Sequence, residues 1–278
     1  GAGVAATIGA TATVQSVADP QAANNTATAT IATTPPNFIR LQSDAGDYIG
    51  GGASYSYTRA NASIGVNANG GQLSVQVNGD ETWFAEFRLP ASLSQFQAGS
   101  FTNLTRFPFH DPAVGGLSWS GEGRGCNTLS GSFTVTNASY ANGVLDAIDL
   151  NFEQRCENGA AALRGQIHWT SADNTLPPGP VNPPPAGLWA PTAGATPTSG
   201  DYVYLQSDFG DFIGGGGTYT YTRANALINV GVTGGRLSVT VAGNEGWSGE
   251  FQAMTGIAQP QPGYYGDLRR FPFHNPVK

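Results

Sequence analysis

Two aspartates three residues apart enclose a glycine, and the same arrangement occurs again later in the chain. Asp44 and Asp47 flank Gly46, and Asp208 and Asp211 repeat the pattern. Carboxylate oxygens are preferred ligands of Ca²⁺, although this ion takes six to eight of them. Aspartate also stabilises turns by accepting hydrogen bonds from backbone N–H groups. Because further oxygen ligands are sparse in the stretch, we expect a turn, and a calcium site at these four aspartates is the alternative.

A second pattern combines Glu81, Trp83 and Glu86, and it also recurs later in the chain. Paired carboxylates can hydrolyse glycosides when they lie about 5 to 9 Å apart. On an ideal strand, residues five positions apart point to opposite faces, so these glutamates do not converge without a bulge. We therefore expect no catalytic pair here. Trp83 is a candidate for stacking on a sugar ring, and burial in the core is the default alternative.

Three basic side chains, Arg59, Arg106 and His110, also have identical counterparts later in the chain. Because charged residues are scarce, we expect each arginine to have a carboxylate partner such as Asp44 or Glu86. His110 could be a ligand or a base, but a loop histidine bonded to the backbone is the favoured interpretation.

No nucleophile elbow, phosphate-binding loop or His-x-x-x-His pair occurs in the sequence. We therefore expect no enzymatic activity and no cofactor, apart from the calcium alternative. The candidate ligand-binding residues are Trp83, Arg59, Arg106 and His110.

All of these patterns recur because the chain contains an internal repeat. Residues 41–114 align with residues 205–278 at a constant offset of 164 without a gap, and about 40 of the 74 aligned positions are identical. Such a period is too long for one turn of a solenoid, so it indicates a tandem array of whole domains.

The repeat and the proline content divide the chain into four segments. We predict a partial Ig-like hairpin over 1–36, a complete β repeat unit over 37–172, a proline-rich linker over 173–200 and the first half of a second unit over 201–278. Prolines in the linker favour extended, semi-rigid geometry. We expect both ends to be those of a partial sequence.

Short alternating segments separated by turn residues predict an all-β fold. Leu73, Val75 and Val77 alternate with polar residues, which indicates one buried and one solvated face. The favoured architecture is an antiparallel β-sandwich in tandem, and a closed up-and-down β-barrel is the alternative. Strands are predicted at 7–15, 26–33, 53–58, 62–68, 72–78, 82–88, 117–120, 130–137, 144–152 and 161–169.

Composition narrows the possible partners. Only 11 % of the residues are charged, and the formal net charge is −7. A nucleic-acid partner would need a basic face, so we expect none. There is no uninterrupted apolar run of 18 residues, so we expect no membrane span. A surface of hydroxyl, amide and glycine groups is typical of secreted β proteins.

The two cysteines, Cys126 and Cys156, predict one disulfide. The alternatives are a redox pair and a pair of metal ligands. The bond would close a loop worth about 3.5 kcal/mol in the chain-entropy model. The surrounding strings, 123–131 and 152–157, together with 41–52 and 106–109, resemble an uncharacterised repeat domain of secreted bacterial multidomain proteins. That resemblance implies an extracellular setting and supports the same cysteine pairing, and it brings no established activity.

Residues 19–25 and the Thr/Ala-rich segment after them resemble the C-terminal end of an Ig-like repeat from bacterial surface proteins. We therefore expect an extracellular or cell-surface, noncatalytic binding or adhesion module. Its partner would be an extracellular glycan or a surface protein. The alternatives are a carbohydrate-binding accessory module of a secreted hydrolase and a purely structural stalk.

Overall fold

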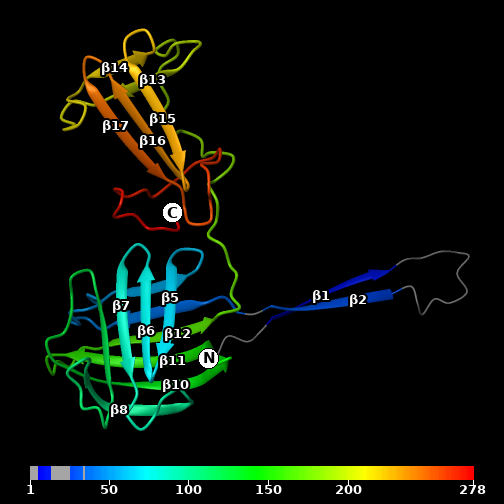
Figure 1. The fold of residues 1–278 in the computed structure, drawn as a ribbon, viewed down its shortest axis with the longest axis vertical. Coiled ribbons are helices and arrows are strands. Elements are labelled where there is room, and N and C mark those ends of the chain that lie inside the picture. Colours follow the sequence, from blue (N-terminus) through cyan, green and yellow to red (C-terminus); the bar gives the residue numbers. More distant parts are fainter. Residues whose placement is uncertain (1–5, 14–25, 34) are drawn as a thin grey trace, which may run out of the picture. The chain divides into compact units, whose positions relative to one another are not determined.

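The computed structural model describes residues 6–13, 26–33 and 35–278 (Figure 1). These residues fall into two compact units, Gly1–Leu176 and Pro177–Lys278, which are described separately. The boundary between the units lies within the predicted linker. The turn predicted at 19–25 lies outside the described residues. The described part of the chain has no helix that is long and apolar enough to cross a bilayer.

The first unit begins with a two-stranded hairpin. β1 (Ala6–Thr13) pairs antiparallel with β2 (Thr26–Thr33), so that Ala6 lies opposite Thr33. Both strands are rich in threonine, whose branched Cβ suits an extended backbone. The two predicted strands are confirmed over their described residues, and the Ig-like identity of the hairpin stays a prediction.

The rest of the first unit is one ten-stranded sheet in the order β4-β3-β12-β11-β10-β8-β9-β7-β6-β5. Its strands are β3 (Phe38–Ser43), β4 (Ser54–Thr58), β5 (Ser63–Asn69), β6 (Gln72–Asn78), β7 (Thr82–Arg88), β8 (Gly99–Arg106), β9 (Gly116–Gly121), β10 (Leu129–Ala141), β11 (Val144–Cys156) and β12 (Leu163–Thr170).

This sheet curls into a nearly closed barrel whose two edge strands, β4 and β5, are neighbours in sequence. Figure 1 shows β5, β6 and β7 running across β10, β11 and β12 on the opposite side of the core. The fold is all-β as predicted, but the predicted sandwich is not what this sheet forms. It comes closer to the barrel alternative, because curling leaves only two short edges unpaired.

β3 pairs with β12, which joins the start of the unit to its end as in an up-and-down barrel. The order departs from up-and-down in two places, because β9 lies between β7 and β8, and the sequence neighbours β4 and β5 are the edges of the sheet and do not pair. β9 pairs antiparallel with β7 but parallel with β8. Neither β3 nor β8 is predicted from the sequence. β8 buries only Leu104 completely, so it has no alternating pattern to detect.

Large aromatic and aliphatic side chains fill the barrel. Leu73, Val75 and Val77 point inward from β6, as their alternation predicts. The ring of Phe87 packs edge-on against Phe133 and Phe152, at centroid distances of 5.4 and 5.5 Å. These contacts join β7 to β10 and β11 across the interior.

The predicted disulfide is present. Cys126 bonds to Cys156, and the bond links the segment before β10 to the last residue of β11. Since β10 and β11 already pair along their whole length, the disulfide fastens one end of the longest hairpin in the barrel.

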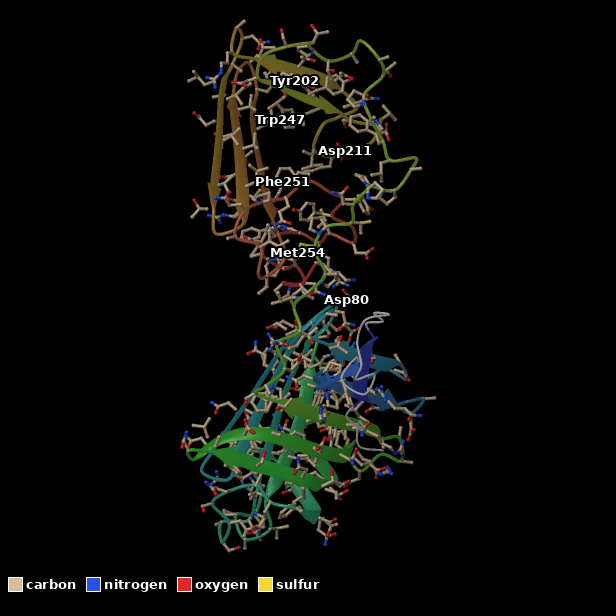
Figure 2. The ribbon with its side chains drawn as sticks, turned by 90° about the vertical axis from the view of Figure 1, so that its right-hand side faces the viewer. Asp80, Tyr202, Asp211, Trp247, Phe251 and Met254 are labelled. Carbon is tan, nitrogen blue, oxygen red and sulfur yellow. A yellow bond between two sulfur atoms is a disulfide. The ribbon has the colours of Figure 1, made fainter. Side chains whose placement is uncertain are left out.

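The second unit has two small sheets that repeat the first strands of the barrel. β13 (Tyr202–Gln206) pairs with β14 (Thr218–Thr222), as β3 does with β4. β15 (Leu227–Thr233), β16 (Arg236–Ala242) and β17 (Gly246–Gln252) form a meander equivalent to β5, β6 and β7. Figure 2 shows side chains from both sheets, including Tyr202 and Trp247.

Candidate functional site

The repeated aspartates build turns. Asp47 accepts a hydrogen bond from the Ser43 hydroxyl at 2.7 Å and one from the Gly50 N–H at 2.8 Å. Asp211 makes the equivalent bonds to Ser207 and Gly214 at the same two distances. The N–H of Gly214 and the Ser207 hydroxyl lower the pKa of Asp211, because both stabilise its charged form.

Asp44 has a different role in the same turn. One of its carboxylate oxygens lies 2.7 Å from Arg164 Nη1, and the other accepts the Ala162 N–H at 3.1 Å. The hydrogen bond from Arg164 is the main reason why the pKa of Asp44 is lowered. In the described residues, no group of three or more His, Cys, Asp or Glu side chains could hold a metal ion. The carboxylates of Asp44 and Asp47 are thus engaged in ion-pair and turn contacts, as the turn interpretation expects.

Trp83 lies in the core and its side chain is fully buried. Its Nε1 donates a hydrogen bond of 2.8 Å to the Tyr57 hydroxyl, and Tyr55 meets its ring edge-on at 5.1 Å. Burial raises the pKa of Tyr57 to about 12. The candidate role of Trp83 in stacking on a sugar is thus corrected, because no face of the indole reaches solvent.

The expected partners of Arg59 are also corrected. Its guanidinium donates to the backbone carbonyl of Asp173, and not to Asp44 or Glu86. Glu86 instead accepts hydrogen bonds from Gln72 and Ser74 on the neighbouring strand. The turn after β4 is therefore tied to the segment after β12, a pairing that is distant in sequence and has no local signal.

Arg106 and His110 lie together in the loop 106–112, which we call the Phe loop. His110 stacks on Phe107 at a centroid distance of 5.5 Å and packs over Gly116, where a Cβ atom would lie 2.7 Å from His110 Cβ. The stacking on Phe107 and the contact with Gly116 make His110 a packing residue. The end of the Phe loop is held by Pro112, whose carbonyl accepts the Ala91 N–H at 2.8 Å.

The sequence favours a hydrogen bond from His110 to the backbone, but Nδ1 of His110 makes no such bond. That nitrogen is buried and has no hydrogen-bond partner among the described residues, and the same is true of His274 Nδ1 in the second unit. The stacking on an adjacent phenylalanine is also repeated, since His274 lies 5.4 Å from Phe271.

At the tip of the Phe loop, Phe109 points into solvent with 78 % of its surface exposed. The guanidinium of Arg106 lies 5.4 Å from the ring centroid, and its Nη1 donates to the Asn127 carbonyl at 3.3 Å. Arg106 has no carboxylate partner among the described residues, so that expectation is also wrong. Arg106 supports the ring of Phe109 and leaves most of the ring free.

The second unit repeats this loop in conformation as well as in sequence. Phe273, the counterpart of Phe109, is 75 % exposed. The carbonyl of Pro276 accepts the Thr255 N–H at 2.7 Å, and Asn275 Oδ1 accepts the Val277 N–H at 3.1 Å. The equivalent bonds in the first unit are those of Pro112 and Asp111. Both loops thus hold an exposed phenylalanine at the tip.

Phe109 is not among the site residues expected from the sequence, although the sequence carries a signal for it. A large apolar residue between proline and a polar loop segment is identical in both copies, where a solvated loop would tolerate many residues. An exposed phenylalanine on an anchored loop can stack on the C–H face of a sugar ring or enter an apolar pocket of a protein.

A shallow depression of about 620 Å³ with polar side chains at its rim lies elsewhere on the first unit, over β4, β3, β12 and β11. Its exposed rim comes from alternate residues that face away from the core. These residues are Arg40, Gln42, Ser54, Ser56 and Asn151. Amides, hydroxyls and a guanidinium are the groups that hydrogen-bond to sugar hydroxyls. The depression is distinct from the Phe loop in the residues that form it.

No family model, curated protein or solved structure matches this chain. Both resemblances drawn from the sequence, to a secreted repeat domain and to an Ig-like repeat, therefore remain predictions, and the function is argued from the geometry above.

Proposed function

We propose that this chain is a noncatalytic binding module of an extracellular or surface-attached protein, and that the Phe loop of each unit contacts the ligand. The observation that carries this proposal is the exposure of Phe109 and Phe273 at the tips of two loops with the same anchoring bonds. Exposed phenylalanine has a cost in water, so keeping it in two sister loops favours a role in contact with another molecule.

The placement of the other repeated polar residues supports binding over catalysis. Asp44 and Asp47 hold one turn, Arg59 ties down another, and Glu86 bonds to its neighbouring strand. An enzyme requires an acid, a base or a nucleophile to converge on one reacting atom. Here each of these groups serves a separate structural contact.

Duplication of a whole unit also fits binding. When one unit holds a ligand, the second unit acts at a raised effective concentration, so two weak contacts give a much stronger combined one. The benefit needs a ligand with repeated features, such as a polysaccharide or a densely covered surface. We favour an extracellular glycan, because an exposed aromatic ring can stack on the apolar face of a sugar, and the polar side chains at the rim of the depression can bond to sugar hydroxyls.

The second candidate is a carbohydrate-binding accessory module of a secreted hydrolase. The depression over β3, β4, β11 and β12 favours it, since its amides and hydroxyls suit sugar hydroxyls. The core position of Trp83 counts against a flat tryptophan platform, so in this version Phe109 would supply the stacking. A purely structural stalk would leave the exposed phenylalanines without a role.

The test is binding of the full chain to a glycan array and to immobilised polysaccharides, with Phe109→Ala, Phe273→Ala and the double variant. Burying a phenylalanine contributes about 1.5–3 kcal/mol, so each single variant should bind roughly 10- to 100-fold more weakly. The double variant should lose more than either single one. Val144→Ala, which removes an exposed apolar group outside the loop, is the matched control.

The thermal transition of each variant should match the parent, because both rings contact mainly solvent. A double variant that binds every glycan as the parent does would refute the proposal. Binding that depends on Arg40 and Gln42 but not on the phenylalanines would move the site to the depression and favour the accessory-module alternative.

A further inference from the structure

The depression on the first unit lies over a regular array of polar side chains. Two rows cross β11, β12, β3 and β4 in turn, with one residue from each strand. The first row is Asn151, Gln166, Arg40 and Ser56, and the second is Glu153, Arg164, Gln42 and Ser54. Residues that lie opposite one another in antiparallel strands share a face of the sheet. Every member of both rows except Glu153 lines the depression, so the array forms its surface.

The charged side chains that line the depression are both positive. They are Arg40 and Arg164, and no carboxylate is part of the lining. Asp44 and Glu153 neutralise Arg164 at 2.7 and 2.8 Å. Arg40 forms no ion pair with any residue that the structure describes. In a chain with a formal net charge of −7, an unpaired guanidinium in a depression attracts an anion locally.

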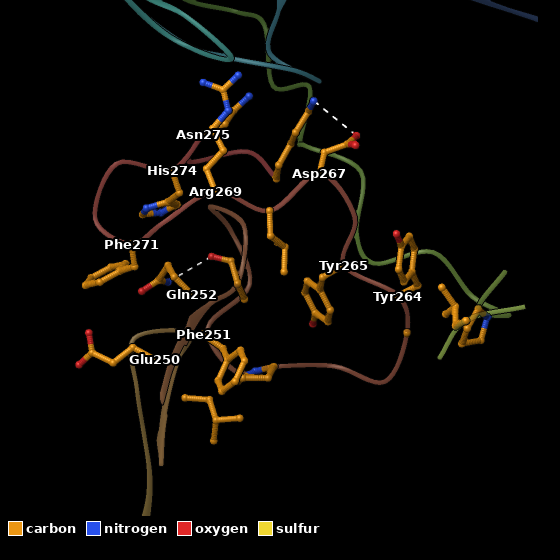
Figure 3. A pocket seen from close by; sticks show the side chains of 18 residues that line it. Glu250, Phe251, Gln252, Tyr264, Tyr265, Asp267, Arg269, Phe271, His274 and Asn275 are labelled. Carbon is orange, nitrogen blue, oxygen red and sulfur yellow. Dashed lines mark hydrogen bonds and ion pairs between the residues drawn. The ribbon is translucent and has the colours of Figure 1, made fainter. Parts of the chain in front are cut away.

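A pocket of the second unit has a different charge. Figure 3 shows the side chains that line this pocket, whose volume is about 440 Å³. Glu250 and Asp267 line it together with Arg269 and Lys278, and Lys278 Nζ lies 3.7 Å from Asp267. Positive and negative groups are therefore balanced there. The counterpart of Arg40 in the second unit is Tyr204, so the unpaired cation is a feature of the first unit.

Neighbouring rings hold Arg40 in position. Its guanidinium lies 4.7 Å from the ring centroid of Phe38. Phe38 stacks in turn on His168 at 5.3 Å, and His168 Nδ1 lies 2.6 Å from Asp149 Oδ1. Arg40 donates no hydrogen bond to a described residue, so its N–H groups are available to a ligand. The planar fork of arginine matches a pair of acidic oxygens.

The amides beside Arg40 are also available. In the described part of the chain, the side chains of Gln42, Asn151 and Gln166 hydrogen-bond to no other residue. Other amides of the first unit have internal partners, since Gln72 donates to Glu86 and Gln154 donates to the Trp119 carbonyl. A free carboxamide offers both donors and an acceptor, which suits the hydroxyl groups of a sugar.

We propose that the depression binds an anionic sugar. The acidic group of the sugar pairs with Arg40, and its hydroxyls bond to the amides of Gln42, Asn151 and Gln166. A uronic acid and a sulfated sugar share this chemistry. The inference rests on the proposed function only in taking the ligand to be a glycan, because the Phe loop contributes no residue to this site.

The experiment measures binding of the full chain to polygalacturonate, dextran sulfate, neutral dextran and polyglutamate by calorimetric titration. We expect at least one of the two acidic polysaccharides to bind at least tenfold more tightly than dextran and polyglutamate. Added salt should weaken this binding, because it screens exposed charges. The comparison of polygalacturonate with dextran sulfate identifies the acidic group.

Variants of Arg40 locate the site. Arg40→Gln should weaken binding of the acidic polysaccharide at least tenfold, because hydrogen bonds to a charged group are lost. Arg40→Lys should recover part of the binding, since it keeps the charge but not the planar fork. Arg88→Gln removes the same charge from β7 and is the matched control. The thermal transition of Arg40→Gln should match that of the parent, because Arg40 is exposed.

Three results would overturn the inference: no binding to either acidic polysaccharide, equal binding of polyglutamate, or unchanged binding by Arg40→Gln. The variant without Phe109 and Phe273 separates this inference from the proposed function. Binding that survives in this double variant and is lost in Arg40→Gln would support the depression and count against the Phe loop. Binding that is lost in the double variant and survives in Arg40→Gln would overturn the inference and leave the proposed function supported.

Discussion

Phe87 and Phe251 occupy equivalent positions in two copies of one sequence, so truncating each to alanine compares the same change in two environments. Phe87 is fully buried and packs against Phe133 and Phe152, whereas Phe251 is 56 % exposed. Removing a buried phenylalanine leaves a cavity and lowers the free energy of unfolding by about 3–5 kcal/mol. Phe251 keeps over half of its surface in water, so Phe251→Ala should lower the free energy of unfolding by less than half as much, about 1–2 kcal/mol.

The assay is denaturant titration of the full chain and of each variant, with hydrogen exchange of β7 and β17 to assign each loss to its unit. The loss of stability that hydrogen exchange reports for β7 in Phe87→Ala should be at least twice the loss that it reports for β17 in Phe251→Ala. Leu73→Ala and Leu237→Ala form a second matched pair with the same expected order. Equal losses at Phe87 and Phe251 would refute the reasoning, since they would mean that Phe251 is as well covered as Phe87.

Two further predictions concern polar groups of the first unit. The hydrogen bond from Arg164 lowers the pKa of Asp44, so this carboxylate contributes to stability at pH values above its ordinary pKa of 3.8, and the contribution is lost as the pH falls through the folded-state pKa. Arg164→Gln should flatten this part of a profile of stability against pH. An unchanged profile would contradict the assignment. Tyr57→Phe leaves Trp83 Nε1 buried without its acceptor, which should lower the free energy of unfolding by about 1–3 kcal/mol in a denaturant titration; no loss would mean that another acceptor replaces Tyr57.

Local pattern was sufficient for the strands whose faces differ clearly. β6 and β7 were predicted with their observed bounds, because apolar and polar residues alternate along them and tight turns limit them. β3 was missed although Ile39 and Leu41 alternate with exposed residues in it. β8 was missed because it faces solvent on most positions.

The site residues divide in a similar way. The turn role of Asp47 followed from its type and its glycine neighbours, because such bonds form within a few residues. The partners of Arg59 and Asp44 lie more than a hundred residues away, in Asp173 and Arg164, so no local pattern could name them. Trp83 shows the same limit, because an indole suits both a core and a binding surface.

The sequence by itself determined the repeat unit, the all-β class, the cysteine pair and the turns, because each depends on residue identity or on contacts between near neighbours. Only the tertiary structure decided that the strands curl into a nearly closed barrel, that Trp83 is buried and that Phe109 is exposed. It also decided that Phe87 and Phe251 meet different surroundings. The physical reason is that burial depends on strands that come together from the whole unit, and the residues of a short segment do not specify which distant strands will cover it.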